Sequence, residues 1–228
     1  MENTWDNATT CEKVEGPCEL IRRDEISKAL RMTKKGKAAG PTGIVSEMFT
    51  AEEDCSVKWL TSHCNLIVAQ GRIPDDWKSC ILQPIFKGKG DPMECGSYRA
   101  IKLLEHAMKV IECVFERRIR EKVKIDAMQF GFMPVKGTTD AVFTVRQMQE
   151  KYGCKGKKLY SAFVDLEKAF DRVAREVTRW ALRKPGVAVD EWLVKAVMAM
   201  YEGAQTVVRT TEGDSKAFNV KVVCLFGV

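Results

Sequence analysis

Apolar residues recur at the spacing of a helix in five separate stretches of the chain. This periodicity predicts helices over residues 23–33, 56–69, 105–121, 138–152 and 191–201. In each helix the apolar side chains would form one stripe on a single face. The predicted stripes include Ile26, Ala29 and Leu30; Val57, Leu60, Cys64, Ile67 and Val68; Ala107, Val110, Ile111, Val114, Phe115 and Ile119; and Ala141, Val142, Val145 and Met148.

Shorter apolar runs between turn residues predict strands. Residues 79–86 form such a run before a Gly-rich turn at 87–92. Residues 206–209 and 218–223 are expected to pair around the turn at 212–215.

A fourth apolar run, 158–165, is rich in aromatic and β-branched residues and predicts a buried strand. Helical spacing then resumes over 169–181. Because helices and strands are intermixed without regular alternation, the expected fold is α+β, with mixed helices and a small antiparallel sheet.

The composition is that of a globular protein. The 228 residues can bury one core, and 45% hydrophobic with 30% charged residues lies outside the disordered class. No apolar run approaches the roughly 20 residues that cross a bilayer, and the polar start MENTWDNATT lacks the apolar core of a signal peptide. Nine cysteines without a CxxC pair, with only two histidines, argue against a zinc site. These features predict a cytoplasmic or nuclear protein with reduced thiols.

The net charge of +6 is unevenly distributed along the chain. It is −3 over residues 1–77, +5 over 78–124 and +4 over 125–228. A polyanion such as a nucleic acid would be attracted to the middle and C-terminal parts. An excess of this size is equally typical of ordinary surface solvation, so both interpretations stay open.

Asp165 stands at the end of the run 158–165, just before the helical spacing resumes. There its carboxylate and the carbonyl of Leu166 could offer hard oxygen ligands to Mg²⁺, and Phe170 could stand over a bound sugar. The alternative is that Asp165 only caps the helix that follows.

Two further segments contain side chains that could bind the phosphates or bases of a nucleotide or nucleic acid. Lys87, Lys89 and Arg99 flank or follow the 87–92 turn, where long cations could close over a triphosphate, or could be ordinary surface residues. The segment 129–137 pairs two phenylalanines with a glycine and a predicted helix start, capped by Thr138 or Thr139, which would suit contact with a strand of nucleic acid. Its candidate residues are Gln129, Phe130, Gly131, Phe132, Lys136 and Gly137, and the two phenylalanines could instead be core.

The sequence resembles the reverse transcriptases of non-long-terminal-repeat retrotransposons, especially the RTE or BovB type. The resemblance is carried by five segments in the family's order: GKAAGPTGI at 36–44, GRIPDDWK at 71–78, the stretch 84–104 with SYRAIKLL, QFGFMPVKGTTDAVF at 129–143 and FVDLEKAFD at 163–171. It implies an incomplete right-hand polymerase after a polar segment 1–20, with fingers over about 21–157 and the first part of the palm over about 158–228.

The resemblance also assigns roles to residues. It implies that Asp165 is catalytic and binds Mg²⁺, that Arg99 binds the incoming nucleotide's phosphates with Lys87 or Lys89, and that the 129–137 segment contacts the template. The implied partners are an RNA template, a DNA primer and deoxynucleoside triphosphates, with no membrane. The oligomeric state is not predicted.

The sequence departs from the family's pattern in several places. The Tyr-Ala-Asp-Asp motif that carries the second catalytic carboxylates is missing, and Thr42 stands where the family usually has Asp; Ala174 and Pro185 also depart. Two-metal catalysis needs both carboxylate sets, so we expect a truncated and inactive polymerase domain. The alternatives are a residual RNA- or DNA-binding module without catalysis and a relic without function.

Overall fold

The structure is a computed structural model that describes residues 11, 13–165, 173–184, 187 and 189–220. It divides into two compact units, one formed by residues 1–123 and 170–228 and the other by Lys124–Ala169. The larger unit contains α1 (Arg23–Met32), α2 (Ser46–Ala51), α3 (Glu53–Gln70), η2 (Asp75–Trp77), β1 (Ser79–Phe86), η3 (Cys95–Ser97), β2 (Tyr98–Leu103), α4 (His106–Lys122), α7 (Arg175–Arg183), α8 (Glu191–Ala199), β3 (Gln205–Thr210), β4 (Gly213–Asp214) and β5 (Phe218–Asn219). The smaller unit contains α5 (Thr138–Gly153).

The core of the larger unit lies among α1, α3, α4 and α8. The predicted stripes of the first three helices are confirmed: their apolar side chains are buried, apart from Val68 and Ile119, which are partly buried against the same cluster. Val189, Leu193, Val194, Ala196 and Val197 complete the cluster from the region of α8. Helical periodicity therefore predicted both the elements and the faces that they bury.

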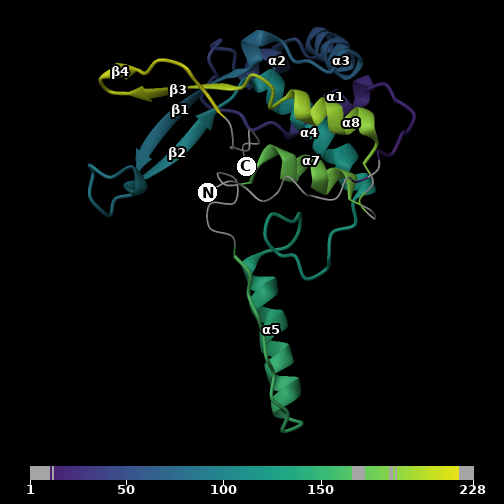
Figure 1. Ribbon diagram of the computed structural model, residues 1–228, viewed down its shortest axis with the longest axis vertical. Helices are drawn as coiled ribbons and strands as arrows, with labels where there is room; N and C mark the ends of the chain where they lie inside the picture. Colours follow the sequence, from purple (N-terminus) through teal and green to yellow (C-terminus); the bar gives the residue numbers. More distant parts are fainter. Residues whose placement is uncertain (1–10, 12, 166–172, 185–186, 188, 221–228) are drawn as a thin grey trace. The chain divides into compact units, whose positions relative to one another are not determined.

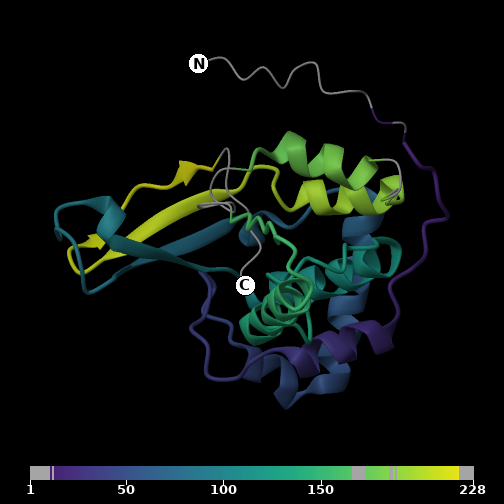
Figure 2. The same ribbon diagram turned by 90° about the horizontal axis from the view of Figure 1, so that it is seen from below.

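The strands form one five-stranded sheet in the order β2-β1-β3-β4, with β5 also paired to β3. β1 and β2 are antiparallel, from Ile81 opposite Leu103 to Phe86 opposite Tyr98. β3 pairs with β4 and β5 antiparallel, but with β1 in parallel. The expectation of an antiparallel sheet is therefore wrong in this respect, because α4 and α8 lie on the long crossover that lets β3 run beside β1. Figures 1 and 2 show the β1–β2 hairpin extending away from the helices of the larger unit.

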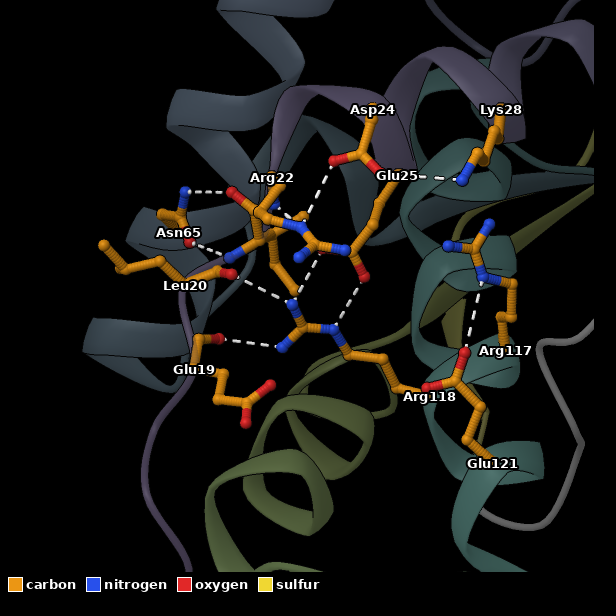
Figure 3. A network of polar contacts seen from close by, with 11 residues as sticks. Glu19, Leu20, Arg22, Asp24, Glu25, Lys28, Asn65, Arg117, Arg118 and Glu121 are labelled. Carbon is orange, nitrogen blue, oxygen red and sulfur yellow. Dashed lines mark hydrogen bonds and ion pairs between the residues drawn. The ribbon is translucent and has the colours of Figure 1, made fainter.

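A buried ion pair attaches the segment before α1 to the core. Arg118 of α4 donates from Nε and Nη2 to the two carboxylate oxygens of Glu25, at 2.9 and 2.8 Å. It also donates to the carbonyls of Glu19 and Leu20, at 2.8 and 2.9 Å, and its guanidinium lies over the ring of Trp192. Figure 3 shows Arg118 pointing into this set of acceptors. Each of the three guanidinium nitrogens therefore donates to at least one oxygen, as a buried charge requires.

In the smaller unit the structure differs from two expectations. None of the residues of α5 is buried, so its apolar stripe is not covered. The predicted strand over 158–165 is not formed: these residues have no regular structure, and Tyr160, Phe163 and Val164 are 85%, 78% and 86% exposed. A strand needs a neighbouring strand for its hydrogen bonds, and none of the described strands pairs with this segment.

No helix among the described residues is long and apolar enough to cross a membrane.

Candidate functional site

The β1–β2 hairpin presents the predicted phosphate-binding cations. Ile85 lies opposite Arg99, and the Lys87 amide donates to the Ser97 carbonyl at 2.9 Å to continue the ladder. In an antiparallel pair, opposite residues project from the same face of the sheet, so Ile85 and Arg99 share a face. Arg99 is exposed and forms no ion pair with any residue that the structure describes.

The two lysines of the hairpin turn differ in their contacts. The Lys87 ammonium donates to the carbonyl of Gly96 at 2.7 Å and so helps to close the turn. Lys89 is exposed and has no such contact within the described part of the chain. Gly90 has a φ of 89°, and a Cβ there would lie 2.6 Å from the Ser97 hydroxyl, so the turn needs glycine at this position. The geometry leaves Lys89 and Arg99 available for an anion.

The loop over 36–44 is attached to the start of α4 by residues that sequence reasoning did not single out. Glu105, 2% exposed, accepts from the Thr42 amide at 2.8 Å and from the Thr42 hydroxyl at 2.6 Å. His106, 1% exposed, hydrogen-bonds the Ala38 carbonyl through Nε2 at 3.1 Å. A Cβ on Gly40 would lie 2.8 Å from the Glu105 amide nitrogen, so this loop approaches the helix start too closely for a side chain. No sequence pattern predicts a contact between residues so far apart in the chain.

The 129–137 segment of the smaller unit is ordered by Lys136. Its ammonium donates to the carbonyls of Ala127 and Gln129, at 2.6 and 3.2 Å, and lies 5.3 Å from the centre of the Phe130 ring. Phe132 has a positive φ of 57° and is 68% exposed. Of the two phenylalanines, Phe132 is the more exposed residue.

The start of α5 is capped differently from the expectation. The prediction that Thr138 or Thr139 caps the helix is wrong, because both lie within it and Gly137 is the N-cap. The carboxylate of Asp140 accepts from the Gly137 amide at 2.7 Å instead. This acceptor and its negative charge occupy part of the helix N-terminus that a phosphate would use.

Asp165 is exposed at the end of the segment 158–165. Leu166 and Phe170, the other residues predicted around it, lie outside the described residues. Within the described part of the chain, no group of three or more His, Cys, Asp or Glu side chains could hold a metal ion. Asp165 therefore fits the chemistry of a single Mg²⁺ ligand, but these residues do not assemble a metal site.

The only adjacent aspartate pair, Asp75-Asp76, lies in η2. The Lys78 ammonium donates to Asp75 at 2.6 Å. Because η2 is a helical turn rather than a hairpin between strands, this pair does not replace the paired aspartates that the family places in a hairpin.

The comparison with protein families decides the identity. Residues 86–227 match the model of the family described as reverse transcriptase (RNA-dependent DNA polymerase), which is more than half of the chain. The chain belongs to the reverse transcriptase family. The match begins at the end of β1 and includes the hairpin turn, the 129–137 segment and Asp165.

Among curated proteins, this reverse transcriptase chain is similar to those of non-long-terminal-repeat retrotransposons, as the sequence motifs predicted. It is 30% identical over 161 residues to the Pol polyprotein of the type-1 retrotransposable element R1 of Bradysia coprophila, covering 67% of this chain and 15% of that protein. It is 27% identical over 188 residues to the R2 polyprotein of Nasonia vitripennis, covering 82% and 17%, and 26% identical over 166 residues to the polymerase from mobile element jockey of Drosophila melanogaster, covering 69% and 18%. The chain thus spans less than a fifth of the length of these relatives.

Proposed function

We propose that residues 21–228 form the fingers and the first part of the palm of a retrotransposon reverse transcriptase of the RTE or BovB type. In this proposal the β1–β2 hairpin binds the triphosphate of an incoming deoxynucleotide. The observation that carries it is Arg99, which is exposed and without an ion-pair partner among the described residues, beside a turn that the family model matches. An exposed guanidinium without an ion-pair partner can donate the paired, charge-assisted hydrogen bonds that phosphates accept.

Lys89 is the lysine that we assign as the partner of Arg99 on the phosphates. Lys87 is the weaker candidate because its ammonium already donates to the Gly96 carbonyl and would have to exchange that bond for the ligand. Phe170 would lie over the sugar, a role that rests on the family resemblance.

The template strand is proposed to lie at the 129–137 segment. The exposed ring of Phe132 supports stacking with a base, and the close approach of backbone that Gly131 allows would leave room for the strand. Lys136 and Phe130 would support this loop, since the ammonium is directed at the carbonyls and ring of the loop itself. Gln129, whose amide donates to the Gly131 carbonyl at 3.0 Å, would hold the turn, and Gly137 would present the helix start. An RNA template and a DNA primer are the proposed partners.

Asp165, with the carbonyl of Leu166, is proposed to supply oxygen ligands to Mg²⁺, which in this chemistry would stabilise the negative charge of the reacting phosphate. The 228 residues contain this first carboxylate motif but no Tyr-Ala-Asp-Asp. We therefore expect these residues on their own to bind substrates without synthesising DNA.

Binding of a deoxynucleotide tests the role of the hairpin. Isothermal titration of dTTP with Mg²⁺ into the 228-residue chain should give binding that falls at least about tenfold in Arg99→Gln, since one bidentate charged contact contributes about 1.5–3 kcal/mol. Lys216→Gln, which removes an exposed lysine elsewhere in the same unit, should leave the affinity within about twofold. Equal weakening by both substitutions, or none by Arg99→Gln, would contradict the assignment.

Primer extension tests the expected lack of synthesis. The purified chain with an RNA template, a DNA primer, Mg²⁺ and all four deoxynucleotides should give no extended product. Extension that disappears in Asp165→Ala would show that the chain is a complete catalyst and would overturn this part of the proposal.

The second candidate is a nucleic-acid-binding module without nucleotide binding. The basic excess of residues 78–228 favours it, because attraction to phosphates needs no nucleotide pocket. In that case RNA binding would weaken steeply with salt and would survive both Arg99→Gln and Asp165→Ala. A broad, noncooperative thermal transition would instead favour the third interpretation, a relic without a stable fold.

A further inference from the structure

A groove lies between α7 and α8 of the larger unit, with a volume of about 590 Å³. Both views of the ribbon show the two helices side by side (Figures 1 and 2). Three arginines spaced four residues apart on α7 line it, together with two residues of α8 and one that follows α8: Arg175, Arg179, Arg183, Lys195, Met198 and Glu202. The volume lies in the range of pockets that take small molecules.

One of the cations in the groove is already neutralised. Arg183 donates from Nε and Nη2 to the two oxygens of Glu191, at 2.9 and 2.6 Å, and Glu191 is 2% exposed. This bidentate, largely buried pair forms one end of the groove and leaves no charge for a ligand.

Three other cationic side chains that line the groove can still bind an anion. Lys195 is exposed and has no ion-pair partner within the described ranges. Arg179 pairs with Glu176 at 2.9 Å, but the two side chains are 39% and 73% exposed, and such a pair exchanges readily for a better acceptor. Arg175 lies over the Tyr201 ring and donates from Nη2 to the Val220 carbonyl, while its buried Nε has no hydrogen-bond partner.

The rest of the lining is not that of a simple anion site. Met198 offers an apolar surface from α8 that can cover the face of a planar base, whereas Val194 and Ala199, which are 1% and 3% exposed, contribute little. Glu202 is exposed at the edge and can accept hydrogen bonds from hydroxyl groups. A ligand that fits the whole lining therefore carries phosphate, hydroxyl groups and an apolar ring together.

We propose that this groove binds a free nucleoside phosphate. Its phosphates contact Arg175, Arg179 and Lys195, its base packs on Met198, and its sugar hydroxyls donate to Glu202. A continuous nucleic acid strand fits less well, because its next phosphates would pass the carboxylate of Glu202 at the edge of the groove. None of these residues belongs to the hairpin, so the site is separate from the nucleotide contact proposed at Arg99.

The test uses the 228-residue chain carrying Arg99→Gln as its reference, so that nucleotide binding at the hairpin is weakened at least about tenfold. ATP is titrated calorimetrically in buffer with EDTA, which also excludes binding through a metal. We expect saturable binding of ATP, at least about tenfold weaker binding of inorganic triphosphate and no binding of adenosine. Adding Lys195→Gln or Arg179→Gln should weaken ATP binding at least about fivefold, whereas adding the matched Lys216→Gln should change it less than about twofold.

Circular dichroism and the thermal midpoint establish that each variant is folded before the titration. The proposal is overturned if ATP does not bind to the folded reference chain, or if Lys195→Gln and Arg179→Gln bind it as the reference does. Inorganic triphosphate binding as tightly as ATP would show that the groove binds anions without contacting the base, and would contradict the role of Met198. A 12-nucleotide RNA that binds through Lys195 where ATP does not would show a strand-binding groove instead.

Discussion

The Thr42 hydroxyl donates a 2.6 Å hydrogen bond to Glu105, a carboxylate that is only 2% exposed at the start of α4. The Thr42 amide donates to the same side chain. The resemblance described above implies Asp as the usual residue at the position of Thr42, and the hydroxyl donor in this chain suits the carboxylate that it meets. The relationship explains why a departure from the family's pattern is compatible with this fold.

Thr42→Asp should therefore destabilise the larger unit. It would place a second carboxylate beside a buried one and remove a hydrogen bond, at a cost of about 1–3 kcal/mol. Thr42→Ser keeps the hydroxyl and should cost less than about 1 kcal/mol. Urea unfolding at pH 7 measures both variants, and a Thr42→Asp variant as stable as the wild type would contradict the contact.

Arg118 should contribute far more to stability than its neighbour Arg117. Arg118→Leu leaves the buried Glu25 with only the Arg22 amide and a 4.0 Å contact to the exposed Arg22 guanidinium, which costs about 3–5 kcal/mol. Arg117 forms a pair with Glu121 at 3.8 Å at the surface, and its replacement should cost less than about 1 kcal/mol. Unfolding of Arg118→Leu and Arg117→Leu in urea gives the comparison. Similar losses in the two variants would contradict the network in Figure 3.

The stabilisation that the Arg118–Glu25 ion pair provides should depend on pH. Burial raises the pKa of Glu25, but hydrogen bonds from Arg118 and the Arg22 amide, with the charges of both arginines, outweigh it and hold the pKa below the usual 4.5. The stabilisation is therefore present above about pH 4.5 and is lost as the pH falls through the lower pKa of the folded state. Arg118→Leu should weaken this loss of stability in acid.

Glu112 should have the opposite effect, so that the free energy of unfolding falls as the pH rises. Burial raises the pKa of its carboxyl from 4.5 to about 8, although Lys109 lowers it. Between these values the folded chain holds a proton that the unfolded chain releases, so stability falls as the pH rises from about 4.5 to 8. Glu112→Gln should remove this fall and be more stable than the wild type at pH 8 by about 1–3 kcal/mol. Unfolding free energies at pH 5 and pH 8 test it, and an unchanged difference between the two pH values would contradict the assignment.

The helices whose apolar faces pack in the core could be predicted from the sequence. The periodic stripes of α1, α3 and α4 identified side chains that are buried, and β1 has the predicted bounds of 79–86. β2 was not predicted because none of its residues YRAIKL is buried and they show no alternation of apolar and polar side chains. The residues 158–165 have the composition of a strand, but composition does not provide the neighbour that a strand needs.

The candidate site was predictable in its residue types and not in its contacts. The sequence identified Lys87 and Lys89 as equivalent, whereas the Gly96 carbonyl distinguishes them through the geometry of the turn. Glu105 and His106 gave no signal, because their partners Thr42 and Ala38 lie more than sixty residues away. The groove between α7 and α8 could not be predicted from the sequence either, since it depends on how the two helices pack.

Binding of a primer annealed to an RNA template is the measurement that tests the central claim most directly. A fluorescent RNA–DNA duplex with a template overhang is titrated with the 228-residue chain at about 50 and 200 mM salt. The account predicts binding at the lower salt that weakens at least about tenfold at the higher salt, and a further loss in Phe132→Ala, since stacking on one base contributes about 1–3 kcal/mol. A folded chain that does not bind the duplex at 50 mM salt, or binds it equally at both concentrations, would contradict the account.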